Sequence, residues 1–152
     1  MSVFHQILVA HDGSTDSDAA LDLAVALARD QHATLTLLTV VPDLSAAATS
    51  AAGAYDLDRV YGEINRRARD GVPTDVAVRT VLRHGAPARA ITELAAGHDL
   101  VVMGTHGRGR IGEALAGSVS RAVVHALRGP VLLMRAPADA APEPTVAGEI
   151  GR

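Results

Sequence analysis

Glycine and serine residues in the second half of the chain form a pattern whose chemistry is anion binding. Two residues separate Gly104 from Gly107, and nine more lead to Gly117 and Ser118. Glycines let the backbone approach phosphate oxygens closely, and a helix that begins at Ser118 offers a hydroxyl and unpaired N–H groups to negative charge. Arg108 adds a cationic side chain. The pattern therefore predicts a phosphate-binding loop.

Two other interpretations of this segment stay open. Residues 107–112 also fit G-x-G-x-x-G, the dinucleotide fingerprint, but they follow the fourth apolar run of the chain, and Leu132 stands where that fingerprint needs an acid. Alternatively, the glycines only permit a tight connection and bind nothing. A turn needs one or two glycines, whereas five lie between Gly104 and Gly117, which favours the phosphate-binding interpretation.

Composition excludes several other classes of function. The chain has 152 residues, 14 basic and 17 acidic side chains, a net charge of −3 and three aromatic residues. This balance argues against nucleic acid as a partner, because nucleic-acid binding needs basic surface and stacking platforms. All basic residues are arginine, so a P-loop lysine, a Schiff base and a response-regulator receiver site are excluded. The lack of cysteine excludes thiolate catalysis and cysteine zinc sites.

Metal binding and membrane insertion are not expected either. The seven histidines show no recognisable metal-ligand spacing. His11 and His106, which follow the first and the fourth apolar run, are the two of most interest. No apolar run approaches the roughly 18 residues of a membrane span, and the first residues lack a signal peptide's features. We therefore expect a cytoplasmic protein without membrane contact.

The residues around the glycine pattern predict strands that alternate with helices. Short apolar runs indicate strands, and the segments between them carry the periodicity and capping residues of helices. The strands are expected at 7–10, 34–41, 75–83, 100–103 and 131–134, and the helices at about 15–31, 56–70, 86–96 and 118–128. Such an order predicts a single α/β domain over residues 1–136, with a parallel sheet covered by helices on both faces. Residues 43–54 read as a mobile small-residue loop and 137–152 as a disordered tail.

The helix at 15–31 begins with Asp16 and Asp18, two acids that the helix dipole favours there. Acids at a helix start repel phosphate, so we place the expected anion beside the fourth strand and not beside the first.

The chain resembles the universal stress protein family over about residues 3–136. The resemblance is carried by I-L-V-A-H-D-G-S at the start, T-L-L-T-V-V-P in the second strand, R-H-G-A-P-A-R-A-I, V-V-M-G-T-H-G-R-G, and G-S-V-S followed by G-P-V-L-L-M. The family's ATP-binding branch is marked by G-x2-G-x9-G-[S/T], and this sequence satisfies that pattern. The resemblance implies a single open five-stranded parallel sheet in the order 3-2-1-4-5, Rossmann-like and similar to the adenine nucleotide alpha hydrolases.

The resemblance also implies site residues for ATP, bound with or without Mg²⁺. Around the adenine and ribose it places Ala10, Asp12 and Val40, and under the sugar and α-phosphate Met103 and Gly104. The remaining positions contact the phosphates: Gly107, Arg108, Gly117, Ser118, Val119 and Ser120. Without the resemblance, ordinary core packing at strand ends is the favoured role for Val40 and Met103. Alanine at Gly104 or Gly117 is expected to weaken ATP binding while the fold survives.

The function implied is that of a cytoplasmic ATP-binding stress protein in which ATP acts as a bound effector, without a catalytic residue or a metal site of its own. The alternatives are a slow ATPase or phosphotransferase that uses the same nucleotide site, and an interaction module that binds no nucleotide. A homodimer through residues 131–134 is expected, since an uncovered apolar edge strand invites pairing with a second copy. The sequence does not identify a downstream partner.

Overall fold

Strands and helices alternate along the computed structural model of the chain, which describes residues 1–43, 51–106 and 117–137. The elements in these ranges are β1 (Gln6–Ala10), α1 (Thr15–Gln31), β2 (Thr34–Val41), α2 (Ala51–Asp70), β3 (Val78–His84), α3 (Pro87–Ala95), β4 (Leu100–Gly104), α4 (Ser118–Ala126) and β5 (Val131–Met134).

The five strands form one parallel sheet in the order β3-β2-β1-β4-β5. β1 lies at its centre, with Ala10 paired to Leu38 of β2 on one side and to Met103 of β4 on the other. The sheet order and the parallel direction confirm the predicted fold class. β3 and β5 are the two edges.

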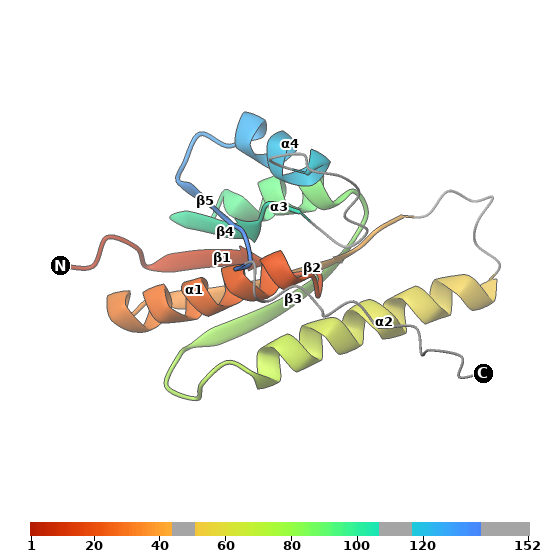
Figure 1. Cartoon of the computed structure of the whole chain (residues 1–152), viewed down its shortest axis with the longest axis horizontal. Coiled ribbons are helices and arrows are strands. Elements are labelled where there is room, and N and C mark those ends of the chain that lie inside the picture. Colours follow the sequence, from red (N-terminus) through yellow and green to blue (C-terminus); the bar gives the residue numbers. More distant parts are fainter. Residues whose placement is uncertain (44–50, 107–116, 138–152) are drawn as a thin grey trace, which may run out of the picture.

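Helices cover both faces of the sheet (Figure 1). On the face covered by α1 and α2, the strands contribute Ile7, Val9, Leu35, Leu37, Leu100 and Val102 to one buried cluster. On the face covered by α3 and α4, they contribute Leu8, Leu38, Val40, Val101 and Met103 to the other. Because successive strand residues point to opposite faces, each nearly uniform apolar strand supplies both clusters.

The starts of α2 and β3 differ from the predicted ones by three residues or more, whereas the other predicted boundaries agree within two residues. α2 begins at Ala51 and not at Asp56, because the alanines before Asp56 have the highest helix propensity and continue the helix backwards. β3 begins at Val78 and not at Asp75. Val76 N–H donates to the Pro73 carbonyl at 3.1 Å, and Arg29 of α1 holds the Asp75 carboxylate through two hydrogen bonds of 2.7 and 2.9 Å. These contacts fix a turn where the sequence pattern indicates a strand.

The predicted loop at 43–54 is wrong over residues 51–54, which belong to α2. Its residues 44–50 lie outside the described residues, as does the predicted disordered tail at 138–152. Within the described ranges, no helix combines the length and the apolar character needed to cross a lipid bilayer.

The connections around β1 create the geometric feature that matters for function. The helix that follows β1 is α1, on one face of the sheet, and the next described helix after β4 is α4, on the other face (Figure 1). The loops that follow β1 and β4 therefore diverge at the carboxyl ends of two neighbouring strands. Open α/β sheets bind ligands at such a switch point.

Candidate functional site

Three of the predicted site residues lie near the carboxyl ends of neighbouring strands and belong to one packed cluster. Ala10 ends β1 and is half-buried, while Val40 in β2 and Met103 in β4 are buried. All three pack into the cluster on the α3 and α4 face. The structure therefore brings them together, and it also gives Val40 and Met103 the core role that the sequence left open.

The loop after β1 is held by its own polar side chains. The Asp12 carboxylate accepts a hydrogen bond from Ser14 N–H at 3.0 Å, and Asp12 N–H donates to Ser17 Oγ at 3.3 Å. Ser14 caps α1 by accepting from Ser17 N–H at 3.2 Å. Gly13 has a φ of +84°, a conformation that favours glycine. Asp12 thus shapes this loop through its own hydrogen bonds, independently of any ligand that the loop contacts.

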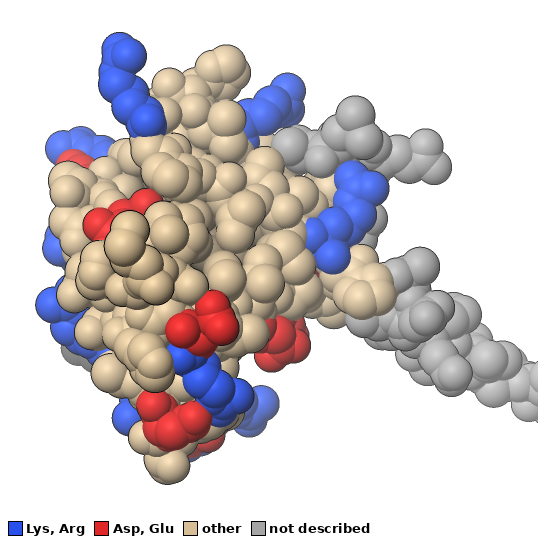
Figure 2. All heavy atoms as spheres, turned by 90° about the vertical axis from the view of Figure 1, so that its left-hand side faces the viewer, with Lys and Arg blue, Asp and Glu red and all other residues tan. Residues whose placement is uncertain are grey.

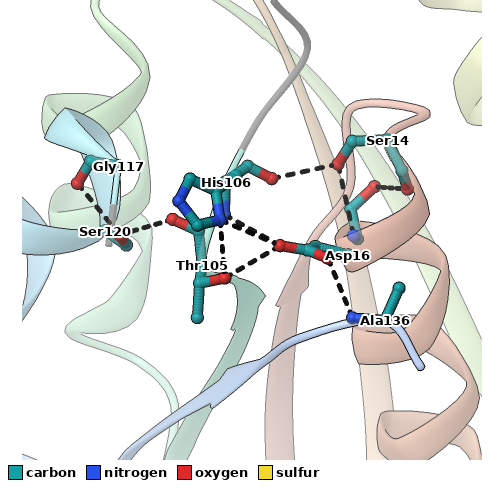
Figure 3. Close-up of polar contacts among 8 residues, drawn as sticks. Ser14, Asp16, Thr105, His106, Gly117, Ser120 and Ala136 are labelled. Atoms are coloured by element: carbon teal, nitrogen blue, oxygen red, sulfur yellow. Dashed lines mark hydrogen bonds and ion pairs between the residues drawn. The ribbon is translucent and has the colours of Figure 1, made fainter. Parts of the chain in front are cut away.

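The exit of β4 is anchored to the start of α4 through Thr105 (Figure 3). The Thr105 carbonyl accepts a hydrogen bond from Gly117 N–H at 2.6 Å and another from the Ser120 hydroxyl at 2.9 Å. The two ends of the glycine pattern that the structure describes, Gly104 and Gly117, are therefore close neighbours in space. Gly107 and Arg108 lie outside the described residues.

Packing within the protein constrains both of these glycines. A Cβ on Gly104 would lie 2.8 Å from Asp16 Cβ and 2.9 Å from Ser17 N, in the first turn of α1. A Cβ on Gly117 would lie 3.0 Å from the Thr105 carbonyl oxygen. Alanine at Gly104 is therefore expected to strain the contact with α1, because atoms of the α1 main chain already occupy that space.

The first turn of α4 divides the remaining predicted residues by burial. Ser118 is exposed, whereas Val119 is half-buried and packs against the same cluster as Met103. Ser120 is buried, and its hydroxyl donates to the carbonyl oxygens of Thr105 and Gly117. Gly117 is the N-cap and gives the turn no side-chain cap, so this helix start is suited to an external anion. Ser118 is the described side chain best placed for such contact.

The sequence interpretation missed the role of Asp16. Its carboxylate is 2% exposed and accepts hydrogen bonds from the Thr105 hydroxyl at 2.8 Å, from His106 N–H at 3.2 Å and from Ala136 N–H at 2.8 Å. Burial raises the pKa of Asp16, but the hydrogen bonds from Ala136, Thr105 and His106 outweigh it and hold the pKa below its usual value. An acid in a helix's first turn is typically solvent-exposed, so no sequence signal distinguishes this one.

Asp18, the other acid in the first turn of α1, is exposed where Asp16 is buried, and it contacts one of the two histidines singled out in the sequence. Asp18 has a side chain that is 62% exposed, and it contacts His11 Nε2 at 2.7 Å. His11 is buried, and its Nδ1 has no hydrogen-bond partner within the described parts of the chain. His106 is also buried, next to Asp16. In the same described ranges, no group of three histidine, aspartate or glutamate side chains is arranged to hold a metal ion.

A cavity of about 280 Å³ lies at the opposite ends of β4 and β5, where these strands begin. Apolar residues such as Leu100 and Leu127 line much of it. Of its acidic and basic lining residues, Asp99 accepts hydrogen bonds from the N–H groups of His5 and Gln6. Figure 2 shows the side of the molecule that carries the N-terminus: positive and negative side chains are interspersed there among uncharged surface. The predicted site residues lie at the other end of the sheet.

The sheet order and the polar switch point define the class of protein. It is a doubly wound α/β protein with an anion-suited helix start beside the central strand pair. The universal stress protein family model matches residues 4–135, and the chain belongs to this family.

Relatives of known sequence match along nearly all of the chain. Universal stress protein YxiE of Bacillus subtilis is 31% identical over 148 residues, covering 88% of this chain and all of the relative. A universal stress protein of Thermus aquaticus is 37% identical over 140 residues, with the same coverage.

Solved structures agree with the fold. UspA from Lactobacillus plantarum superposes with a TM-score of 0.71 at 26% identity, covering 89% of this chain and all of that one. A universal stress protein solved in complex with cAMP superposes with a TM-score of 0.62 at 30% identity, covering 90% of this chain and all of that one. The predicted family is confirmed.

Proposed function

We propose that this protein binds an adenine nucleotide, ATP in particular, at the carboxyl ends of β1 and β4. In this proposal the nucleotide is a bound effector in a stress response and shifts the population of conformations or the affinity for a partner. The observation that carries the proposal is the attachment of the α4 start to the exit of β4 by the Gly117–Thr105 hydrogen bond of 2.6 Å. That contact holds a helix N-terminus beside the switch point, where anions bind favourably.

Two further findings support this assignment. The sequence satisfies the complete glycine and serine pattern from Gly104 to Ser118. A relative of similar structure, 30% identical to this chain, has been solved with the adenine nucleotide cAMP. The proposed preference for ATP rests on the glycine pattern, since a longer phosphate chain can use both the loop and the helix start.

The proposed roles divide between the two ends of the nucleotide. Asp12, Ala10 and Val40 serve the base and ribose, with the Asp12 carboxylate as a hydrogen-bond acceptor. The phosphates contact main-chain N–H groups at the start of α4 and the exposed hydroxyl of Ser118. Met103 and Val119 support the site by packing beneath it.

Mass spectrometry of the gently denatured protein tests whether a nucleotide copurifies. Calorimetric titration with ATP and with adenosine then separates the two ends of the site. We expect Asp12→Ala to weaken binding of both ligands and Ser118→Ala to weaken ATP more than adenosine. Ser2→Ala, at an exposed serine near the N-terminus, is the matched control and should change neither affinity. Absence of ATP binding by the wild-type protein would rule out the proposal, and rapid ADP release would favour an enzyme over an effector-binding protein.

A further inference from the structure

Asp16 is a buried carboxylate whose hydrogen bonds join parts of the chain that are far apart in sequence. One oxygen, Oδ2, accepts from the Thr105 hydroxyl and from His106 N–H, both at the exit of β4. The other, Oδ1, accepts from Ala136 N–H at 2.8 Å, just beyond β5. Figure 3 shows Asp16 between these two segments, on the first turn of α1. Both oxygens are therefore committed to the fold.

Thr105 extends this connection to the start of α4. Its hydroxyl donates to Asp16 at 2.8 Å, while its carbonyl accepts from Gly117 N–H at 2.6 Å and from the Ser120 hydroxyl at 2.9 Å. A displacement of Thr105 would therefore displace the first turn of α4. Ser14 adds a parallel contact, because its hydroxyl donates to the His106 carbonyl at 3.3 Å. The start of α1 and the start of α4 are thus held together through two residues of the β4 exit.

We propose that Asp16 is a positioning residue for the phosphate end of the nucleotide site, fixing the start of α4 through Thr105. The inference rests on the proposed function and adds to it a residue that need not touch the ligand. Because Asp16 holds the helix start in place before binding, less conformational entropy is lost when the nucleotide binds.

Simple electrostatics predicts the opposite effect of the Asp16 charge. A carboxylate near the phosphate site repels the ligand, so its replacement by a neutral amide should by charge alone strengthen ATP binding. Positioning predicts weaker binding. Because Thr105, His106 and Ala136 supply donors to both oxygens, an amide must turn its NH₂ group toward at least one N–H that then has no acceptor. The two explanations therefore predict changes of opposite sign in the ATP affinity of Asp16→Asn.

Asp16→Asn and Thr105→Val test the proposal from both sides of the contact. Thr105→Val keeps the shape of the side chain and the charge of Asp16 but removes the hydroxyl donor. Asp22→Asn is the matched control, at an exposed position of the same helix. Affinity for ATP and for adenosine would be measured by calorimetry on full-length protein, below the lowest melting temperature of the set.

We expect ATP affinity to fall about tenfold, or about 1.4 kcal/mol, in both Asp16→Asn and Thr105→Val, with adenosine affinity within about twofold of wild type. A purely structural role would leave the folded variants with unchanged affinities or reduce both ligands alike, and either result overturns the proposal. Unchanged or tighter ATP binding by Asp16→Asn also overturns it. If the wild-type protein binds neither ligand, the proposed function is wrong and this inference falls with it, an outcome distinct from failure of the variants alone.

Discussion

The glycine at position 104 is constrained by the protein itself and not only by a ligand. The nearest atoms to a Cβ built there, at 2.8–2.9 Å, are Asp16 Cβ, Asp16 C and Ser17 N. Two of these three belong to the main chain of α1 and cannot rotate away as the end of a long side chain can. The strand end and the helix start are therefore in closer contact than any residue with a side chain would permit.

Gly104→Ala should destabilise the folded state by about 1–3 kcal/mol, the usual range for overpacking a dense interior. Urea unfolding monitored by circular dichroism measures this change. Gly97→Ala is the matched control, because a Cβ on Gly97 meets nothing within 4 Å. Equal stability of Gly104→Ala and wild type would show that α1 moves aside without cost.

The buried carboxylate of Asp16 predicts a specific dependence of stability on pH. Its pKa in the folded state is held below the usual value, because hydrogen bonds to the charged form outweigh the opposing effect of burial. A group with a lowered folded pKa stabilises the native state above its unfolded pKa, about 3.9, and loses that contribution as pH falls through the folded pKa. The advantage of wild type over Asp16→Asn should therefore be full near pH 7 and shrink below about pH 4. A stability gap that stays constant down to pH 2 would show that charge is not the cause.

The elements of the fold follow closely from the sequence because their signals are local. The run T-L-T-L-L-T-V-V predicts β2 over the same residues that the structure gives, and α1 also agrees at both ends. The start of β3 is predicted wrongly because its cause is not local. Arg29 lies 46 positions before the Asp75 side chain that it holds, and apolar alternation carries no information about such a contact.

In the candidate site, too, the features with local sequence signals are predicted and those that depend on contacts distant in sequence are not. The spacing of Gly104, Gly117 and Ser118 predicts a helix start beside the fourth strand, and the structure has α4 there. The contacts of Asp16 with Thr105 and Ala136 span 89 and 120 positions. No periodicity identifies those partners, so the sequence does not distinguish Asp16 from any other acid in a first helical turn. The same holds for Ser120, whose hydroxyl is committed to a carbonyl 15 positions away.

The helix α2 carries a glycine in its interior that the structure does not require. Gly62 lies within Ala51–Asp70, and a Cβ built on it meets nothing within 4 Å. Gly62→Ala should stabilise the protein by about 0.5–1 kcal/mol, since glycine loses more backbone entropy in a helix than alanine. For a domain of this size we expect the melting temperature to rise by about 1–4 °C. A decrease in melting temperature would indicate a contact made by the backbone at this position.

At the scale of the whole molecule, the two edges of the sheet differ in chemistry. β3 carries exposed Arg79 and Arg83, and charged side chains discourage pairing with another strand. On β5, Leu132 and Leu133 are 38% and 37% exposed, and Val124 of the neighbouring helix α4 is 46% exposed. β3 also exposes an apolar side chain, Leu82, which is 40% exposed. The β5 edge therefore differs from β3 in lacking the charge that protects β3, not in apolar exposure alone.

We predict that β5 pairs with the same strand of a second copy, so that the protein is a dimer at micromolar concentration. Val101 N–H donates to the Pro130 carbonyl and Thr105 N–H to that of Met134. The backbone polar groups of successive strand residues point to opposite sides. The N–H and carbonyl of Leu132, between Pro130 and Met134, therefore also face β4, whereas the N–H of Leu133 faces the outer edge of the sheet. Leu133→Pro should therefore give a folded monomer, while Leu132→Pro should damage the sheet itself. Light scattering would show about twice 15.7 kDa for wild type and about half that mass for Leu133→Pro; a wild-type monomer would reject the predicted pairing.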